Sequence, residues 1–113
     1  MPDKLIKANK ELKEHLYVER SSIHGKGVFA KNRLRKGQYL GTYHGPLVRK
    51  SGTYVLWVED ESGKWTRRDG KNLLRYLNHS RKPNAEFDGF DLYALKNIQP
   101  DQEVTFDYGE DPA

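Results

Sequence analysis

Eight short runs rich in aromatic and β-branched residues, separated by Gly, Pro, Asn or Asp, constrain the fold of this chain more than any other feature. Runs of this kind are typical of β-strands, and the residues between them are typical of turns. The expected strands are residues 16–20, 27–31, 38–43, 53–58, 63–67, 84–87, 90–95 and 103–107. A chain of 113 residues has room for one domain with a modest core. We therefore expect a mainly β domain built from several small sheets.

Turn residues and one apolar stretch predict how some of these strands are connected. Ser62-Gly63 and Asp88-Gly89 each separate two of the runs, and Asp-Gly favours a hairpin turn in which both residues have positive φ. Residues 72–77 contain good helix formers and predict one short helix, which Asp69 or Asn72 would cap.

The N-terminal part of the chain has a different pattern. Residues 3–16 carry an incomplete stripe of apolar residues among lysines and glutamates, which favours a helix or a loosely attached arm. We expect this arm at residues 1–15 and the domain at residues 16–113. No internal repeat or low-complexity linker indicates a further domain.

Composition excludes several classes of function. The chain has no Cys, which excludes disulfides, thiolate zinc sites and a cysteine nucleophile. Its four histidines lack the spacing of a helical metal-binding pair, so we expect no metal. No apolar run is long enough to span a membrane and no secretory signal opens the chain, which predicts a soluble intracellular protein without a membrane partner.

The net charge of +4 makes a polyanionic partner worth considering. The basic residues are spread along the sequence, however, and never exceed two in a row. This distribution favours a solvated basic surface over a direct nucleic-acid ligand.

Three segments carry more polar or glycine-rich chemistry than a plain β core requires. His24-Gly25-Lys26-Gly27 allows close approach of a ligand to the backbone, although a glycine-rich turn would look the same. Residues 75–80 with Pro83-Asn84 form a dense set of hydrogen-bonding side chains, which a ligand or a capped polar loop would satisfy. Residues 103–109 alternate as a strand and by themselves read as an ordinary edge strand.

Taken in this order, the segments closely resemble the signature motifs of the SET-domain family of protein-lysine methyltransferases. The matching stretches are Ile23-His-Gly-Lys-Gly-Val-Phe-Ala30, Asn72-Leu-Leu-Arg-Tyr-Leu-Asn-His-Ser80 with Pro83-Asn84, and Glu103-Val-Thr-Phe-Asp-Tyr-Gly109. Tyr54-Val-Leu56 stands where that family has an intermediate motif, and the resemblance covers about residues 16–109. It implies a SET fold of several small curved sheets, one or two short helices and a C-terminal pseudoknot.

The resemblance also implies an activity and a set of site residues. The activity is transfer of methyl groups from S-adenosylmethionine to the ε-amino group of a protein lysine. Tyr108 matches the tyrosine at the point of methyl transfer. The implied cofactor-binding residues are His24, Gly25, Lys26, Gly27, Tyr54, Arg75, Asn78, His79 and Tyr108. The implied lysine channel is lined by Tyr43, Leu77, Phe87 and Phe106.

These residue types suit the chemistry that the family performs. A lysine must lose its proton before it attacks, which costs about 4–5 kcal/mol at neutral pH for an unperturbed side chain. An aromatic channel lowers that cost because desolvation disfavours the ammonium form. Similar enzymes with a tyrosine at the position of Phe106 tend to stop at monomethyl-lysine, so Phe106 and Phe87 predict di- or trimethylation. Alternatively, the two phenylalanines are ordinary core residues.

Acidic residues gather in sequence around Tyr108 and indicate a basic partner. They would attract a lysine-rich segment of a histone or another basic protein, or they form a solvated surface with one structural glutamate. These acids are Asp101, Glu103, Asp107, Glu110 and Asp111.

The chain also departs from the family pattern. Arg81 replaces a frequent Cys, cysteine-rich flanks are absent, and the insert at residues 59–71 is short. A second subunit, the substrate or the N-terminal arm would then complete the pocket, and a homodimer is one expected arrangement. A non-catalytic SET-fold interaction module and a small basic nucleic-acid-binding domain are the competing interpretations.

Overall fold

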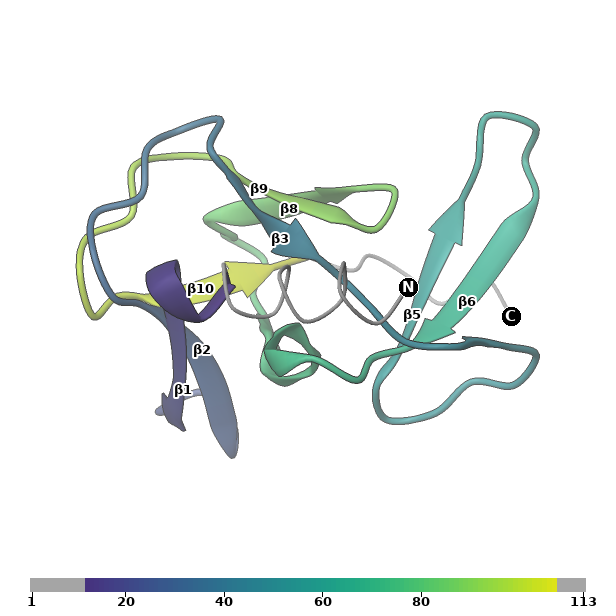
Figure 1. The fold of residues 1–113 in the computed structure, drawn as a ribbon, viewed down its shortest axis with the longest axis horizontal. Helices are drawn as coiled ribbons and strands as arrows, with labels where there is room; N and C mark the ends of the chain where they lie inside the picture. The colour runs from purple at the N-terminus through teal and green to yellow at the C-terminus, as the bar shows by residue number, and fades with distance from the viewer. Residues whose placement is uncertain (1–11, 108–113) are drawn as a thin grey trace.

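The computed structural model describes residues 12–107, which form three small β-sheets, a helical turn at residues 12–15 and one 3₁₀ turn (Figure 1). The strands are β1 (Leu16–Arg20), β2 (Lys26–Ala30), β3 (Tyr39–Thr42), β4 (Leu47–Val48), β5 (Val55–Glu59), β6 (Trp65–Asp69), β7 (Asn78–His79), β8 (Ala85–Asp88), β9 (Asp91–Ala94) and β10 (Glu103–Phe106). The 3₁₀ turn η1 spans Leu73–Tyr76. Within residues 12–107 no helix is long and apolar enough to cross a membrane.

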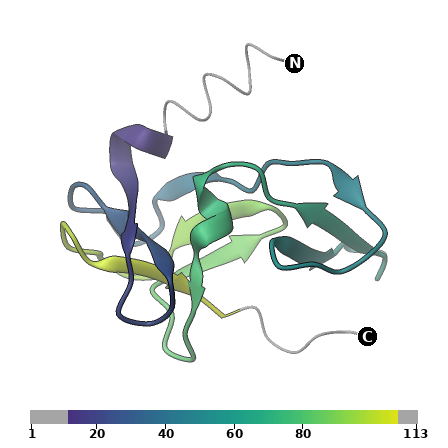
Figure 2. The same cartoon turned by 90° about the horizontal axis from the view of Figure 1, so that it is seen from below.

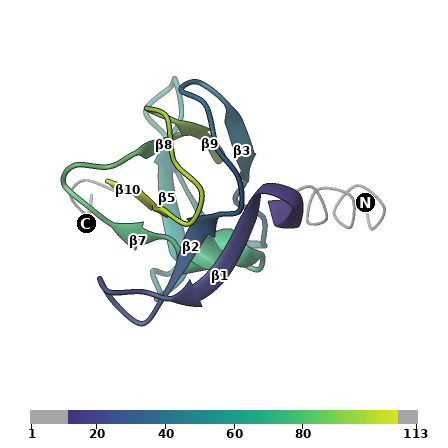
Figure 3. The same ribbon diagram turned by 90° about the vertical axis from the view of Figure 1, so that its left-hand side faces the viewer.

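The first sheet brings the two ends of the described chain together in the order β1-β2-β10-β7. β1 and β2 form an antiparallel hairpin in which Leu16 lies opposite Ala30. β10 then pairs antiparallel with β2 on one side and parallel with β7 on the other. Figure 3 shows β10 inserted between these segments, which are far apart in the sequence.

Two three-stranded sheets complete the fold, with the orders β3-β9-β8 and β4-β6-β5. The β5–β6 hairpin lies at one end of the molecule, away from the β1–β2 hairpin (Figures 1 and 2). Its turn contains Gly63 at a φ of +86°, as the Ser62-Gly63 signal predicts. β5 and β8 are each the outermost strand of their sheet.

The second predicted hairpin turn is shifted by one residue. Asp88 is the last residue of β8 and pairs with Asp91, so the loop consists of Gly89 and Phe90 rather than Asp88 and Gly89. Gly89 has a φ of +62°, whereas Asp88 has no positive φ. Gly at the first loop position is the pattern of a type II′ turn, which lets the aspartate stay in the strand.

The core lies between the first two sheets and η1. Its fully buried large side chains are Leu16, Leu34, Leu74, Leu92, Ile98, Val28 and Val104. The loops before β3 and after β9 are tied by reciprocal backbone hydrogen bonds of 2.8 Å between Leu34 and Ile98. The ten strands in three small sheets confirm the predicted mainly β fold of the described residues.

One predicted element differs in detail from the structure, and two others extend beyond the described residues. The helix expected at residues 72–77 is the shorter 3₁₀ turn, and Asn72 caps it by accepting a hydrogen bond from the backbone N–H of Leu74 at 3.3 Å. Residues 12–15 lie within the stretch predicted as a helix or arm, while residues 1–11 lie outside the described part of the chain. The predicted C-terminal pseudoknot depends on residues beyond Asp107, which also lie outside it.

Candidate functional site

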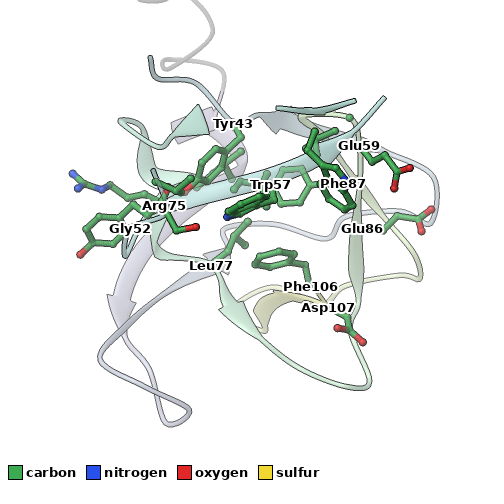
Figure 4. A pocket seen from close by; sticks show the side chains of 18 of the residues that line it. Tyr43, Gly52, Trp57, Glu59, Arg75, Leu77, Glu86, Phe87, Phe106 and Asp107 are labelled. Atoms are coloured by element: carbon green, nitrogen blue, oxygen red, sulfur yellow. The ribbon is translucent and has the colours of Figure 1, made fainter. Parts of the chain in front are cut away.

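A cavity of about 780 Å³ opens between the two edge strands β5 and β8 (Figure 4). The loop before β5, η1 and the end of β10 complete its walls. All four residues predicted for the lysine channel line it, and so do two of the predicted cofactor-binding residues. These six are Tyr43, Leu77, Phe87, Phe106, Tyr54 and Arg75.

Three aromatic rings form one wall of this cavity. The centroids of Phe87 and Phe106 lie 5.2 Å apart with perpendicular planes, and Tyr43 packs edge-on against Phe87 at 5.9 Å. Edge-to-face packing of this kind fixes the orientation of each ring. Phe106 is only 8% exposed and Tyr43 is also buried, whereas Phe87 is partly buried.

Tyr43 carries the polar group of this wall. Its hydroxyl donates a hydrogen bond of 2.5 Å to the backbone carbonyl of Tyr54. Burial, followed by the nearby Asp69 carboxylate, raises the pKa of Tyr43 to about 12. The hydroxyl therefore stays neutral and oriented throughout the range in which proteins work.

Arg75 and Tyr54 form the opposite end of the cavity, and the ring of Tyr76 packs against Tyr54 outside the cavity lining. The Arg75 guanidinium lies 3.9 Å from the centroid of the Tyr54 ring and 5.7 Å from that of Tyr76. The Lys26 ammonium lies 5.5 Å from the Tyr76 centroid. The Arg75 Nε atom is buried and makes no hydrogen bond within residues 12–107. This end therefore offers flat rings, cationic charge and an unused donor to a bound group.

The side chain of Asn78 joins the β1–β2 hairpin to the strand after η1. Its amide nitrogen lies 3.1 Å from the carbonyl oxygens of both His24 and Lys26, and 2.8 Å from a carboxylate oxygen of Glu103. A Cβ added at Gly27 would come 2.3 Å from Glu103 Oε2, so the glycine permits this close approach. Asn78 thus fixes the backbone of the His24–Gly27 loop beside η1.

A sequence model of the SET domain matches residues 25–109. The chain belongs to the SET-domain family. This confirms the family that the sequence motifs predict.

Among curated proteins, the chain is 29% identical over 125 residues to histone-lysine N-methyltransferase MEDEA of Arabidopsis thaliana, covering 92% of this chain and 17% of that protein. It is also 29% identical to histone-lysine N-methyltransferase 2B of Homo sapiens, covering 88% of this chain and 4% of that protein. The chain thus spans only a small part of each relative.

Solved SET-domain structures share the fold. The methyltransferase domain of human histone-lysine N-methyltransferase SETMAR superposes with a TM-score of 0.73 at 23% identity, covering 83% of this chain and 44% of that chain. The Neurospora SET-domain protein DIM-5, a histone lysine methyltransferase, superposes with a TM-score of 0.70 at 20% identity, covering 90% and 56% of the two chains. Because both sequence identities are below 25%, the superpositions establish the fold of this chain alone.

The SET domain divides the predicted site residues into two adjacent groups. The first group lines the cavity. The second group lies outside the cavity lining, around the β1–β2 hairpin and β7, and consists of His24, Gly25, Lys26, Gly27, Asn78 and His79. The groups adjoin where Leu77 precedes Asn78, and Lys26 approaches the ring of Tyr76, which in turn packs against Tyr54 of the first group. His79 Nδ1 lies 3.6 Å from Asp107 Oδ1. Tyr108 lies outside the described residues.

The acidic residues of the SET domain are arranged differently from the predicted cluster. Asp101 accepts a hydrogen bond from Tyr17, and Glu103 accepts one from Ser21, so both serve the fold. Of the predicted acids, Asp107 lines the cavity, while Glu110 and Asp111 lie outside the described residues.

Sequence reasoning missed three acids and two tryptophans that line the cavity: Glu59, Glu86, Asp88, Trp57 and Trp65. In Figure 4 the carboxylates of Glu59, Glu86 and Asp107 lie toward one end of the cavity and Arg75 toward the other. Glu59 and Asp88 lie next to the turns of two predicted hairpins, which was the available signal, but only the packing of β5 opposite β8 brings them to one cavity.

Proposed function

We propose that this SET domain transfers methyl groups from S-adenosylmethionine to the ε-amino group of a protein lysine. The observation that carries the proposal is the cavity in which three aromatic rings face an end formed by Arg75 and Tyr54. The names of the relatives, which are histone-lysine methyltransferases, support the same reaction.

The residues present fit S-adenosylmethionine. The buried Arg75 Nε needs an acceptor, the Tyr54 and Tyr76 rings offer flat surfaces, and Asn78 holds the neighbouring backbone in place. We assign cofactor binding to Arg75, Tyr54 and Asn78 together with the His24–Gly27 loop and His79, and the ring of Tyr76 supports Tyr54. When bound, the cofactor supplies an electrophilic methyl group on a sulfonium centre. We assign Tyr108 to orienting that methyl group.

The aromatic wall prepares the lysine for attack. Deprotonation of an ordinary lysine costs about 4–5 kcal/mol at neutral pH. The rings of Tyr43, Phe87 and Phe106 exclude water and disfavour the ammonium form. Because Tyr43 stays neutral, it adds no negative charge that would hold the lysine protonated. Positioning of the amine against the methyl group then supplies several kcal/mol.

The substrate that suits the cavity is a lysine in a basic protein segment, as in a histone. The acidic end formed by Glu59, Glu86, Asp88 and Asp107 attracts positive charge. The edge strands β5 and β8 present backbone N–H and C=O groups to which an extended peptide can bond. A histone substrate would place the domain at chromatin. The homodimer stays a prediction of the sequence.

We further propose that the domain forms di- or trimethyl-lysine. Phe106 and Phe87 supply no hydroxyl group at this wall that could hold a water molecule where a second methyl group must fit. The Tyr43 hydroxyl of the same wall already donates to the Tyr54 carbonyl, so we expect space for further methyl groups beside the two phenylalanines.

The experiment is methyl transfer from labelled S-adenosylmethionine to histones and other basic proteins, read by mass spectrometry. We compare the wild type with Tyr108→Phe, and with Tyr39→Phe as a matched control because Tyr39 is exposed at 49% and does not line the cavity. The expected result is lysine methylation by the wild type and the control, reduced at least about 100-fold in Tyr108→Phe.

Calorimetry separates the alternatives. Cofactor binding without transfer to any tested protein would contradict the proposed substrate class but keep the cofactor site. Neither transfer nor cofactor binding would overturn the proposal and favour a non-catalytic SET-fold interaction module. Binding of DNA or RNA with a steep salt dependence would favour the nucleic-acid interpretation.

A further inference from the structure

A second cavity, of about 310 Å³, lies beside η1 and is lined by Lys13, Lys71, Asn72, Leu73, Arg75 and Tyr76. Three of these six residues are cationic and none is acidic. The two cavities share Arg75 among their lining residues. Lys13 precedes the part of the chain that matches the SET domain, so this cavity is not made by the family motifs alone.

The helical turn at residues 12–15 holds Lys13 in place. Lys31 donates hydrogen bonds from its side chain to the Lys13 carbonyl at 2.5 Å and from its backbone to the His15 carbonyl at 2.8 Å. Leu12 is 2% exposed and packs against Gly41, whose φ of +154° and missing side chain make room for it. Anchors on both sides of Lys13 therefore fix its backbone at the edge of the cavity.

The cationic charge around this cavity is only partly neutralised. Lys71 pairs with Asp69 at 3.1 Å. Within residues 12–107, neither Lys13 nor Arg75 forms an ion pair. Arg75 packs on aromatic rings, and its buried Nε atom has no hydrogen-bond acceptor there. A concave site with two uncompensated cations and an unused donor favours an anion with several acceptor oxygens.

We propose that this cavity binds the carboxylate or phosphate group of a ligand, with Lys13, Lys71 and Arg75 as its cationic partners. Its volume is at the lower end of small-molecule sites, which suits one anionic group and its immediate neighbours. The site shares Arg75 with the proposed cofactor site, so a cofactor carboxylate as its occupant rests on the proposed function, whereas a separate phosphate-bearing ligand does not. The cofactor's own carboxylate and a separate phosphate-bearing small molecule share this chemistry.

The test is calorimetric titration of inorganic pyrophosphate into the full chain at low ionic strength. We compare the wild type with Lys13→Gln and Lys71→Gln, and use Lys96→Gln as the control because this lysine is exposed and does not line the cavity. The expected result is saturable binding to the wild type and the control, weakened about tenfold or more in each of the other variants. Thermal unfolding of each variant checks that the fold is kept. Absent binding, or equal weakening in Lys96→Gln, would overturn the proposal.

A second titration distinguishes the two sources of the anion. If the cofactor's carboxylate occupies the site, pyrophosphate competes with S-adenosylmethionine, and Lys13→Gln weakens S-adenosylmethionine but not its decarboxylated analogue. If a separate ligand occupies it, pyrophosphate and S-adenosylmethionine bind together. Either result supports the anion site and assigns its occupant. Failure of S-adenosylmethionine to bind would count against the methyl-transfer proposal and leave the pyrophosphate result to stand by itself.

Discussion

The ring of Tyr43 rests against the backbone of Gly70, where an added Cβ would lie 2.4 Å from both Cζ and the hydroxyl oxygen. That distance is too short for any carbon contact, so the ring must move if Gly70 gains a side chain. Movement of the ring would break the hydrogen bond from Tyr43 to the Tyr54 carbonyl and disturb one wall of the cavity.

We therefore expect Gly70→Ala to impair methylation of a peptide while S-adenosylmethionine still binds. Its free energy of unfolding should fall by about 1–3 kcal/mol, as is usual for overpacking. Gly52→Ala is the matched control, because its Cβ would make an ordinary contact of 3.4 Å with Val55. Steady-state kinetics and cofactor titration measure both properties. Equal kinetics in the two variants would show that the position of Tyr43 does not matter.

Phe106 allows a second test at the scale of one residue. Replacing it with tyrosine adds a hydroxyl group to a ring that is 8% exposed and packed at 5.2 Å against Phe87. We expect Phe106→Tyr to shift the products toward monomethyl-lysine, because a hydroxyl there can hold a water molecule in the space of further methyl groups. Mass spectrometry of the methylated peptide measures the distribution. Unchanged di- and trimethylation would contradict the assigned role.

Single residues were predictable where a motif fixes their identity. Asn78 and Arg75 belong to one contiguous segment, and the structure places them beside the predicted His24–Gly27 loop and Tyr54 respectively. Glu86 and Asp88 belong to no motif, and their position at the cavity follows from the packing of two sheets. Periodicity along one strand contains no information about which other strand will face it.

Among the elements, Asn84 connects two strands that belong to different sheets. It lies just before β8 and is 6% exposed. Its amide nitrogen donates to the carbonyl of Glu103 in β10, and its amide oxygen accepts from the backbone N–H of Thr105, each at 2.8 Å. One side chain thus satisfies two backbone groups of β10.

Loss of this side chain should therefore weaken the connection between the two sheets. We expect Asn84→Ala to lower the free energy of unfolding by about 2–4 kcal/mol, because it leaves two buried backbone groups without partners. Asn97→Ala, in an exposed loop where the side chain accepts one hydrogen bond from Lys36, should cost less than about 1 kcal/mol. Urea denaturation measures both. A similar loss in the two variants would refute the linking role of Asn84.

The sequence predicted the longer strands well because alternation over four or five residues is a recognisable signal. β4 and β7 were missed, since strands of two residues carry no period. β7 exists because β10 lies beside it and pairs Thr105 with Asn78. The helix at residues 72–77 shortened to a 3₁₀ turn at Leu73–Tyr76, because Leu77 already has an extended ψ of 131°.

Across the whole molecule, the large cavity is electrically polarised. Acids from β5, β8 and the end of β10 lie at one end, and Arg75 lies at the other. A basic segment and a methyl donor with a carboxylate would thus approach from different ends. Long-range attraction of this kind acts mainly on the rate of association and weakens as salt is added.

We expect Glu86→Gln combined with Asp88→Asn to reduce the affinity for a lysine-rich peptide and to flatten its salt dependence. Both residues are exposed, so their neutralisation should leave the unfolding temperature unchanged. The control combines Glu14→Gln with Glu61→Gln, two exposed acids that do not line the cavity. Fluorescence anisotropy over a range of salt concentrations measures the slope. An identical slope in both double variants would show that net charge alone attracts the peptide.

The position of β10 between β2 and β7 has a consequence for how the domain is made. During synthesis β2 leaves the ribosome long before β10. The edge of β2 at Val28 therefore stays unpaired until Val104 of β10 has been synthesised. The hairpins β1–β2, β5–β6 and β8–β9 can form locally as they emerge, but the sheet that joins the two ends cannot. Pairing across such a separation in sequence slows folding, because the chain loses the entropy of closing a long loop before the strand contacts stabilise it. We therefore expect the sheet that joins the two ends, and the part of the core that it covers, to form late in folding.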